Sequence, residues 1–295
     1  STVTEGISKY KIFIRIAHII ALIIFAFYLA QGLSYYLAPF SERTHLDDYK
    51  ILRPAAIYGH TFGVVGSFFM ICMLTYSLRK RFKIFKHWGS LSKWLDIHIF
   101  LGVYGPLLVI LHTTFKVQGL VAVSFWSMVA VAVSGIFGRY LYLQIPRNIH
   151  GDELSVKELE EMSRGYYDKL KNEFGFTDET LKSLEEHSVS GIDKNVGPAK
   201  VLWILIKDDI KHLFAGQKAQ RRLASRLNIP REAISRFLKA NRRQDLLERR
   251  IVLMNGVQQM FHYWHVIHKP FAFVMYIVML VHIGVTIWTG YKWIF

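Results

Sequence analysis

Four histidines in apolar parts of the sequence form two pairs with the same spacing. They are His98, His112, His268 and His282, and the members of each pair are 14 residues apart. On a helix, 14 residues rise about 21 Å and return to within roughly 40° of the same side. Two parallel helices would therefore bring His98 near His268 at one membrane face and His112 near His282 at the other.

This spacing favours haem over other metal sites. A haem iron needs one axial nitrogen from each side, and the flat macrocycle fits between two helices. Zinc would need further ligands. The only cysteine, Cys72, lies in an apolar stretch, so disulfides, iron–sulfur clusters and covalent haem attachment are excluded. The four histidines are therefore predicted to bind the iron of two b-type haems, while a third haem and a bound quinone stay open.

Three other histidines are weaker candidates for cofactor contacts. His60 lies near the outer end of the second apolar stretch, His18 near the inner end of the first, and His265 one helical turn before His268. Either His60 or His18 could pair with His265 around a third haem, or contact a quinone. A histidine that hydrogen-bonds a neighbouring helix is the competing interpretation for each of them.

Glycines near these histidines predict close approaches of the backbone. Gly102 and Gly105 lie between His98 and His112, where we expect them to admit a porphyrin against the helix. A second group predicts a close contact between helices. This group consists of Gly59, Gly63 and Gly66.

Five apolar stretches are long enough to cross a membrane, which takes about 20 helical residues. They are Ile12–Ala38, Ala55–Leu78, Trp94–Phe115, Gly119–Leu143 and Val266–Thr289. With 52% hydrophobic residues, the chain is predicted to be an all-α, polytopic membrane bundle of five helices. The first stretch is too long for a signal peptide, and we expect it to be retained. The expected parts are residues 1–143 with four spans, a helical cytoplasmic domain at 144–261, and the fifth span at 262–295.

Charges between the spans predict the topology. Residues 79–93 carry six lysines and arginines and no acid, so this short loop is expected in the cytoplasm. The N-terminus is then cytoplasmic, residues 41–53 and the C-terminus are outside, and spans three and five run parallel. A bacterial inner membrane is the expected location. Arg139, at the inner end of span four, could pair with haem propionates or be an ordinary flanking charge.

The long segment between spans four and five has a polar, helical pattern. Ser155 and Glu158 form a predicted capping box that opens a helix running to about Phe174. Pro198 and Pro230 are expected in the first turns of further helices. Residues 201–214 are predicted to form an amphipathic helix on the membrane surface.

Residues 222–243 also resemble a helix-turn-helix DNA reader, with two predicted helices joined at residues 228–230. From Lys218 to Arg250 there are eleven basic residues and three acidic ones. A membrane-tethered regulator is therefore a competing class. We do not expect nucleic acid as a partner, because a basic cytoplasmic surface also suits anionic lipid or an acidic redox partner.

Two segments, LDIHIFLGVYGPLLVILHTTFK and YWHVIHKPFAFVMYIVMLVHIG, resemble the third and fifth helices of the ferric reductase and NADPH oxidase type of transmembrane domain. More loosely, they are similar to cytochrome b of respiratory bc complexes. The resemblance covers roughly Ala55–Leu143 and His262–Gly290. It implies two stacked b-type haems, with the four paired histidines as axial ligands.

The resemblance does not extend to an electron donor. Ferric reductases and NADPH oxidases append a flavin- and nicotinamide-binding module, whereas this sequence has no GxGxxG motif and ends soon after the fifth span. We therefore expect the electron-transfer subunit of a larger complex of the quinol oxidoreductase type. It would carry electrons between a quinone pool or cytoplasmic donor and an outer acceptor, beside subunits such as a c-type cytochrome or an iron–sulfur protein. A ferric or oxygen reductase component fed by a separate flavoprotein is the alternative.

Overall fold

The computed structural model describes residues 2–145, 154–174, 197, 199–207, 209–210 and 231–290. Every regular element in these ranges is helical. The elements are α1 (Thr2–Gln31), α2 (Leu33–Leu37), η1 (Arg43–His45), α3 (Tyr49–Leu52), α4 (Ile57–Arg81), η2 (Lys83–His87), α5 (Leu91–Thr113), α6 (Leu120–Gln144), α7 (Val156–Phe174) and α10 (Arg231–Trp288).

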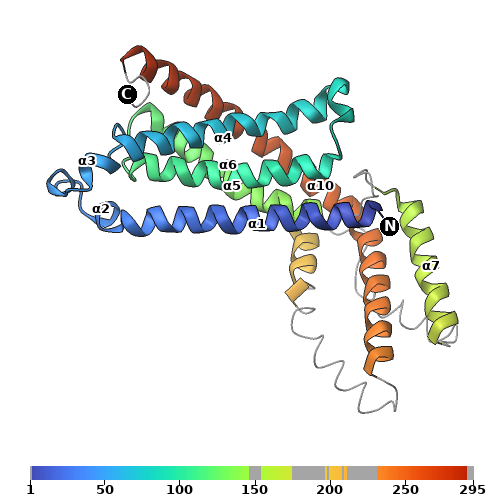
Figure 1. The fold of residues 1–295 in the computed structure, drawn as a ribbon. Coiled ribbons are helices and arrows are strands. Elements are labelled where there is room, and N and C mark those ends of the chain that lie inside the picture. Colours follow the sequence, from blue (N-terminus) through green and yellow to red (C-terminus); the bar gives the residue numbers. More distant parts are fainter. Residues whose placement is uncertain are drawn as a thin grey trace. The chain divides into compact units, whose positions relative to one another are not determined.

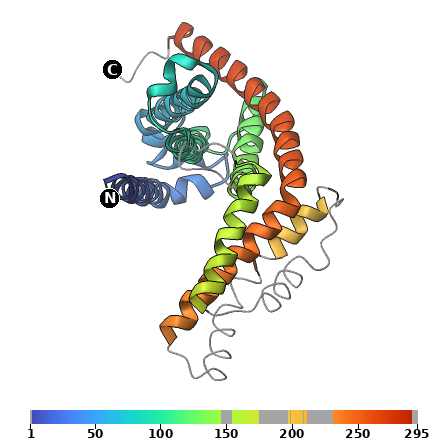
Figure 2. The ribbon, with the colours of Figure 1, turned by 90° about the vertical axis from the view of Figure 1, so that its right-hand side faces the viewer.

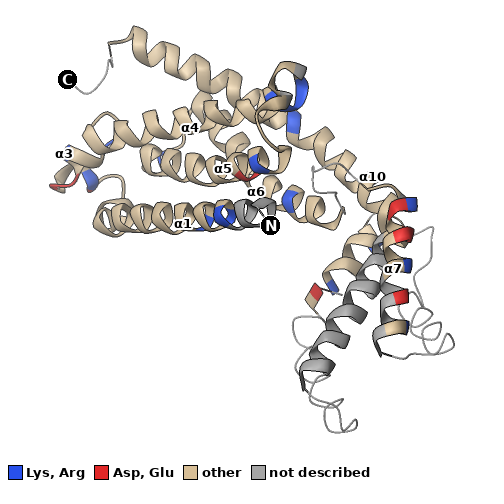
Figure 3. Ribbon diagram, turned by 45° about the vertical axis from the view of Figure 1, so that its right-hand side comes forward, with Lys and Arg blue, Asp and Glu red and all other residues tan. Residues whose placement is uncertain are grey.

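Five of these helices are long and apolar enough to cross a membrane: α1, α4, α5, α6 and α10. Figure 3 shows the charged residues of α4 at its last turn and those of α5 near its start, and the rest of both helices is uncharged. This distribution is what a hydrocarbon layer requires, because charges inside it are costly. The chain is a multi-pass membrane protein, and the predicted all-α class with five spans is confirmed.

The chain divides into two compact units. The first, which we call the membrane unit, contains residues 1–137 and 266–295, and the second contains residues 138–265. Both α6 and α10 have residues in each unit. The histidine pairs identified in the sequence all belong to the membrane unit.

Helices α4 and α5 pack closely along their lengths in the membrane unit (Figure 1). A methyl group at Gly63 would lie 2.7 Å from the His112 ring, and one at Gly66 would lie 3.0 Å from the Gly105 carbonyl. Only glycine therefore permits this approach. The predicted close contact at these α4 glycines is confirmed.

The glycines of α5 lie in the same contact. The side chain of Met73 faces Gly102, and a methyl group at Gly105 would lie 3.2 Å from Met70 Cγ. Side chains of α4 thus face both glycines, and the expectation that they admit a porphyrin stays a prediction.

Helix α1 runs beside α5 in the same direction. The Tyr10 hydroxyl donates to the Lys93 carbonyl (2.9 Å), and farther along α1 the Tyr104 hydroxyl donates to the His18 carbonyl (2.7 Å). Figure 2 shows α1 and the α4–α5 pair nearly end-on. Apolar side chains on α1, such as Phe13 and Ile23, are exposed, as on a helix that faces lipid.

The first membrane helix ends at Gln31, earlier than the predicted Ala38. At Gly32 the chain enters the short helix α2, and a methyl group there would lie 2.6 Å from the ring of Tyr36 and 2.9 Å from Leu52. The chain therefore turns at Gly32, because glycine has no side chain to prevent Tyr36 and Leu52 from packing against the backbone there.

Arg43 holds this following segment against the end of α5. The residue is 7% exposed, and its guanidinium donates to the carbonyls of Ala38 (2.9 Å), Tyr36 (2.8 Å) and Thr114 (2.5 Å). It also lies 4.3 Å from the centre of the Phe40 ring. The buried charge is thus spread over three carbonyl oxygens and an aromatic face.

Helix α7 of the second unit begins with the predicted capping box. The Glu158 N–H donates to Ser155 Oγ (3.3 Å), and the Ser155 N–H and hydroxyl both donate to Glu158 Oε2 (2.7 Å each). The two hydrogen bonds that Ser155 donates lower the pKa of Glu158, and the one from the Ser155 backbone N–H has the larger effect. The helix ends at Phe174, as predicted.

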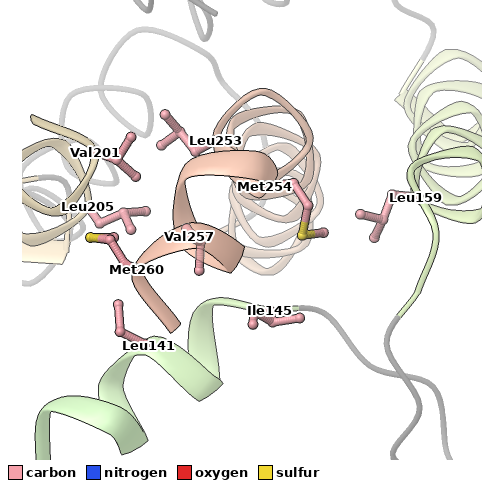
Figure 4. Close-up of a cluster of buried hydrophobic side chains, with 9 residues drawn as sticks. All are labelled: Leu141, Ile145, Leu159, Val201, Leu205, Leu253, Met254, Val257 and Met260. Carbon is pink, nitrogen blue, oxygen red and sulfur yellow. The ribbon is translucent and has the colours of Figure 1, made fainter. Parts of the chain in front are cut away.

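The core of the second unit gathers apolar side chains from α6, α7, α10 and residues 201–205 (Figure 4). They are Leu141, Ile145, Leu159, Val201, Leu205, Leu253, Met254, Val257 and Met260. Val201 also packs against Gly256, where a methyl group would lie 2.7 Å from it.

For this part of the chain, the start of the last helix differs from the expectation, and other expected features lie outside the described residues. The helix of the fifth span begins at Arg231, well before the predicted Val266, because residues 231–250 are polar but good helix formers. Residues 199–207 and 209–210 are helical. Pro198, Pro230 and the expected helix-turn-helix junction at 228–230 lie outside the described residues.

Candidate cofactor site

Two carbonyl oxygens on α4 accept hydrogen bonds from two histidines on α5. His112 Nδ1 lies 2.7 Å from the Gly59 oxygen. His98 Nδ1 lies 3.3 Å from the Met73 oxygen. The acceptors are 14 residues apart, as the histidines are, because the two helices pack antiparallel in a single register.

These hydrogen bonds fix where each ring carries its proton. A carbonyl oxygen can only accept, so Nδ1 of His98 and Nδ1 of His112 must both be N–H groups. In a neutral imidazole the other nitrogen, Nε2, then keeps its lone pair. Among the contacts of the described residues, neither Nε2 atom has a hydrogen bond. Both rings are thus held in the form that can bind a metal.

His268 on α10 contacts a side chain of α6. Its Nδ1 lies 2.7 Å from Ser134 Oγ, and the same hydroxyl donates to the Val131 carbonyl (3.0 Å). Both side chains are partly buried. The histidine nearer the start of the fifth span is therefore also oriented through Nδ1.

His282, the other α10 histidine, lies near His112. The imidazoles of His282 and His60 are both within electrostatic range of His112. The backbone carbonyl of His282 accepts a hydrogen bond from the Thr286 hydroxyl (2.7 Å). His282 is therefore at the same level of the membrane unit as His112.

A cluster of methionines lies between the two histidine levels. Met70, Met128, Met275 and Met279 are buried together, from α4, α6 and α10. The Tyr276 hydroxyl adds a hydrogen bond to the Met70 carbonyl (2.6 Å).

The position of this cluster shows the relative direction of α5 and α10, the two helices that carry the paired histidines. Met275 is seven residues from both His268 and His282, and Met70 packs at Gly105, which is seven residues from both His98 and His112. Because His282 lies near His112, His268 must lie at the His98 end. Helices α5 and α10 therefore run parallel, with their histidines at matching levels.

Two of the additional histidine candidates form local contacts. His18 Nδ1 lies 2.8 Å from the Ile14 oxygen, and its ring packs edge-on against Phe100 at 5.1 Å. His265 Nδ1 lies 2.8 Å from the Phe261 oxygen. Both hydrogen bonds are to a carbonyl one turn earlier on the same helix, not to a neighbouring helix.

The remaining candidates, His60 and Arg139, differ in their surroundings. His60 is near His112 and so belongs to the outer histidine level. The Arg139 guanidinium lies 5.5 Å from the centre of the Tyr142 ring, one turn along α6 in the second unit.

A metal site with three or more protein ligands is not found in the described part of the chain. No group of three His, Cys, Asp or Glu side chains there could hold a metal ion. A haem iron requires less, because the porphyrin supplies four nitrogens and the protein one axial ligand on each side. Two pairs of histidines could meet that requirement, and three of these four side chains have Nδ1 engaged.

Sequence reasoning missed the groups that orient the histidines. The carbonyls of Gly59 and Met73 carry no signal in residue type, because every residue has one. Ser134 could have been noticed as a hydroxyl inside an apolar span, but that span contains no histidine and was given no role. No family model, curated protein or solved structure was found that matches the chain.

Proposed function

We propose that this chain is a dihaem b-type cytochrome that carries electrons across a membrane. His98 and His268 would be the axial ligands of an inner haem, and His112 and His282 those of an outer haem. The observation that carries the proposal is the engagement of Nδ1 in His98, His112 and His268 by groups on neighbouring helices. Such partners orient a ligating imidazole and raise its basicity.

The protein's own residues would provide position, burial and insulation. When bound, each haem supplies one-electron chemistry at its iron. The carbonyls of Gly59 and Met73 hold the α5 rings in one tautomer. The methionine cluster around Met275 fills the layer between the two levels, which are about 21 Å apart along the helices. That separation covers most of the ~30 Å hydrocarbon layer.

We propose the same sidedness as the charges predict, in a bacterial inner membrane. The N-terminus and the loop between α4 and α5 would be cytoplasmic, and the chain would leave span five on the outer side. Partners would be other subunits of a redox complex, with quinone or a cytoplasmic protein as the electron donor.

An absorbance spectrum of the purified protein tests the haem assignment. We expect a low-spin b-type spectrum on reduction with dithionite and two haems per chain. A protein purified from haem-replete cells with no such band would disprove the proposal.

The donor is tested in liposomes containing the haem-loaded protein. Reduction by a quinol, blocked by a quinone-site inhibitor, would support the quinol oxidoreductase type. Reduction only by an added flavoprotein would instead favour the membrane component of a ferric or oxygen reductase.

A further inference from the structure

We infer that Ser134 on α6 is a positioning residue for the inner haem, acting through His268. This inference rests on the proposed function, because it assigns His268 as an axial ligand. It adds a third helix to the inner site, since neither α5 nor α10 provides this hydroxyl.

The hydrogen bonds of Ser134 determine the tautomer of His268. A serine hydroxyl has one proton. Because the Val131 carbonyl can only accept, that proton serves the 3.0 Å contact between Ser134 Oγ and the Val131 oxygen. The 2.7 Å contact with His268 must then be donated by Nδ1–H to the serine oxygen. In the neutral ring the proton is then on Nδ1, and His268 Nε2 is the unprotonated nitrogen.

The tie to Val131 makes Ser134 a directed acceptor rather than a freely rotating hydroxyl. Val131 lies one turn earlier on α6, so the serine oxygen's lone pairs are held toward α10. An acceptor on Nδ1–H increases electron donation from Nε2 to iron, which stabilises the ferric state and lowers the reduction potential. Losing it should make the inner haem easier to reduce.

A second serine on α6 offers a matched control. The Ser124 hydroxyl also bridges α6 to α10, donating to the Met275 carbonyl (3.0 Å). Among the hydrogen bonds of the described residues, this hydroxyl has one to the layer between the histidine levels and none to a histidine. Ser124→Ala therefore removes a comparable bond between the same helices without changing an imidazole.

The test compares Ser134→Thr with Ser134→Val in the purified, haem-loaded full chain. These side chains are nearly equal in shape, and only threonine has a hydroxyl. Potentiometric titration followed by absorbance gives the potential of each haem, and electron paramagnetic resonance reports the ligand field of the ferric inner haem. Ser134→Ala gives the same test without added bulk if the larger side chains do not fit.

We expect Ser134→Thr to match the wild type. Ser134→Val and Ser134→Ala should shift the inner-haem equilibrium about tenfold toward the reduced form, or 59 mV for one electron, or release the inner haem. The outer potential should stay unchanged, as should both potentials in Ser124→Ala.

Two results would overturn the inference. One is equal inner-haem potentials, spectra and haem content in the threonine and valine variants. The other is an equal shift in Ser124→Ala, which would mean that any bond between α6 and α10 has this effect. A wild-type protein without haem would instead contradict the proposed function itself.

Discussion

At the α4–α5 contact, backbone carbonyls of α4 hold the two histidines of α5 that are proposed to bind haem. Gly59 and Met73 contribute carbonyl oxygens at the same 14-residue interval that separates His98 from His112. A shift of α4 by one residue would therefore disturb both histidines together. Helix packing sets the orientation of these two side chains, so substitutions at the packing surface should act on the haems.

Single histidine replacements test the pairing. We expect His112→Ala and His282→Ala each to remove the outer haem and keep the inner one, because one imidazole does not make a bis-histidine site. His98→Ala and His268→Ala should do the reverse. Haem-to-protein ratios and the two-step potentiometric titration give the result. If a His112→Ala or His282→Ala protein keeps both haems in bis-histidine form, the pairing is wrong.

Gly63→Ala should disturb the outer site without replacing a ligand, because it crowds the His112 ring. The added methyl group would lie 2.7 Å from His112 Nδ1, so the ring or helix α4 must move, at a cost of about 1–3 kcal/mol. We expect weaker retention of the outer haem and a lower thermal unfolding midpoint.

Gly135→Ala on α6 is the control for Gly63→Ala, because no described residue beyond the adjoining part of its own helix has an atom within 4 Å of the added methyl group. It should leave haem content and unfolding unchanged. Equal haem retention in the two variants would contradict a tight fit between Gly63 and His112.

Elements were predictable from the sequence where one local pattern determines them. Hydropathy gave the five spans, and Ser155 with Glu158 gave the start of α7. The break at Gly32 was missed, because the apolar pattern continues through it and the folding back depends on Tyr36 and Leu52. The contacts of Gly102 and Gly105 were likewise not predictable from their own sequence, because they depend on how α4 packs against α5.

The histidine spacing made a set of candidates visible, yet the orientation of each ring depends on other helices. Ser134 is 134 positions from His268 in sequence, and no periodicity within either helix relates them. Likewise, the start of α10 at Arg231 reflects helix propensity in a polar segment, which a search for apolar stretches does not detect.

The capping box of α7 should lose strength in acid. Hydrogen bonds from Ser155 lower the pKa of Glu158, so the carboxylate is favoured in the folded state. Its contribution is present above the unfolded pKa, about 4.3, and is lost as pH falls through the lower folded value. Hydrogen exchange, corrected for the intrinsic rate, should show faster opening of the first turn in that range.

Ser155→Ala should produce this faster opening at neutral pH and reduce its dependence on acid. Glu161→Gln, an exposed change on the same helix, serves as the control and should leave the first turn protected. Unchanged protection in Ser155→Ala would mean that the capping box does not hold this helix end.

At the scale of the whole molecule, the described contacts give the membrane helices a consistent direction. Tyr10 meets Lys93 at the starts of α1 and α5, while Arg43 meets Thr114 beyond the end of α5. The N-terminus and the α4–α5 loop therefore share one end of the membrane unit, and residues 32–56 share the other with His112. The proposed inner and outer histidine levels correspond to these two ends.

Cysteine labelling tests which end faces the cytoplasm. In a Cys72→Ala background, we expect Ser41→Cys to react with a membrane-impermeant maleimide in intact spheroplasts. His87→Cys should react only after lysis, because the six basic residues of its loop disfavour transfer across the membrane. Both positions are exposed, so a difference in labelling reflects sidedness rather than burial. The Cys72→Ala parent is the unlabelled control. Labelling of His87→Cys, but not Ser41→Cys, in intact spheroplasts would invert the topology and exchange the inner and outer histidine pairs.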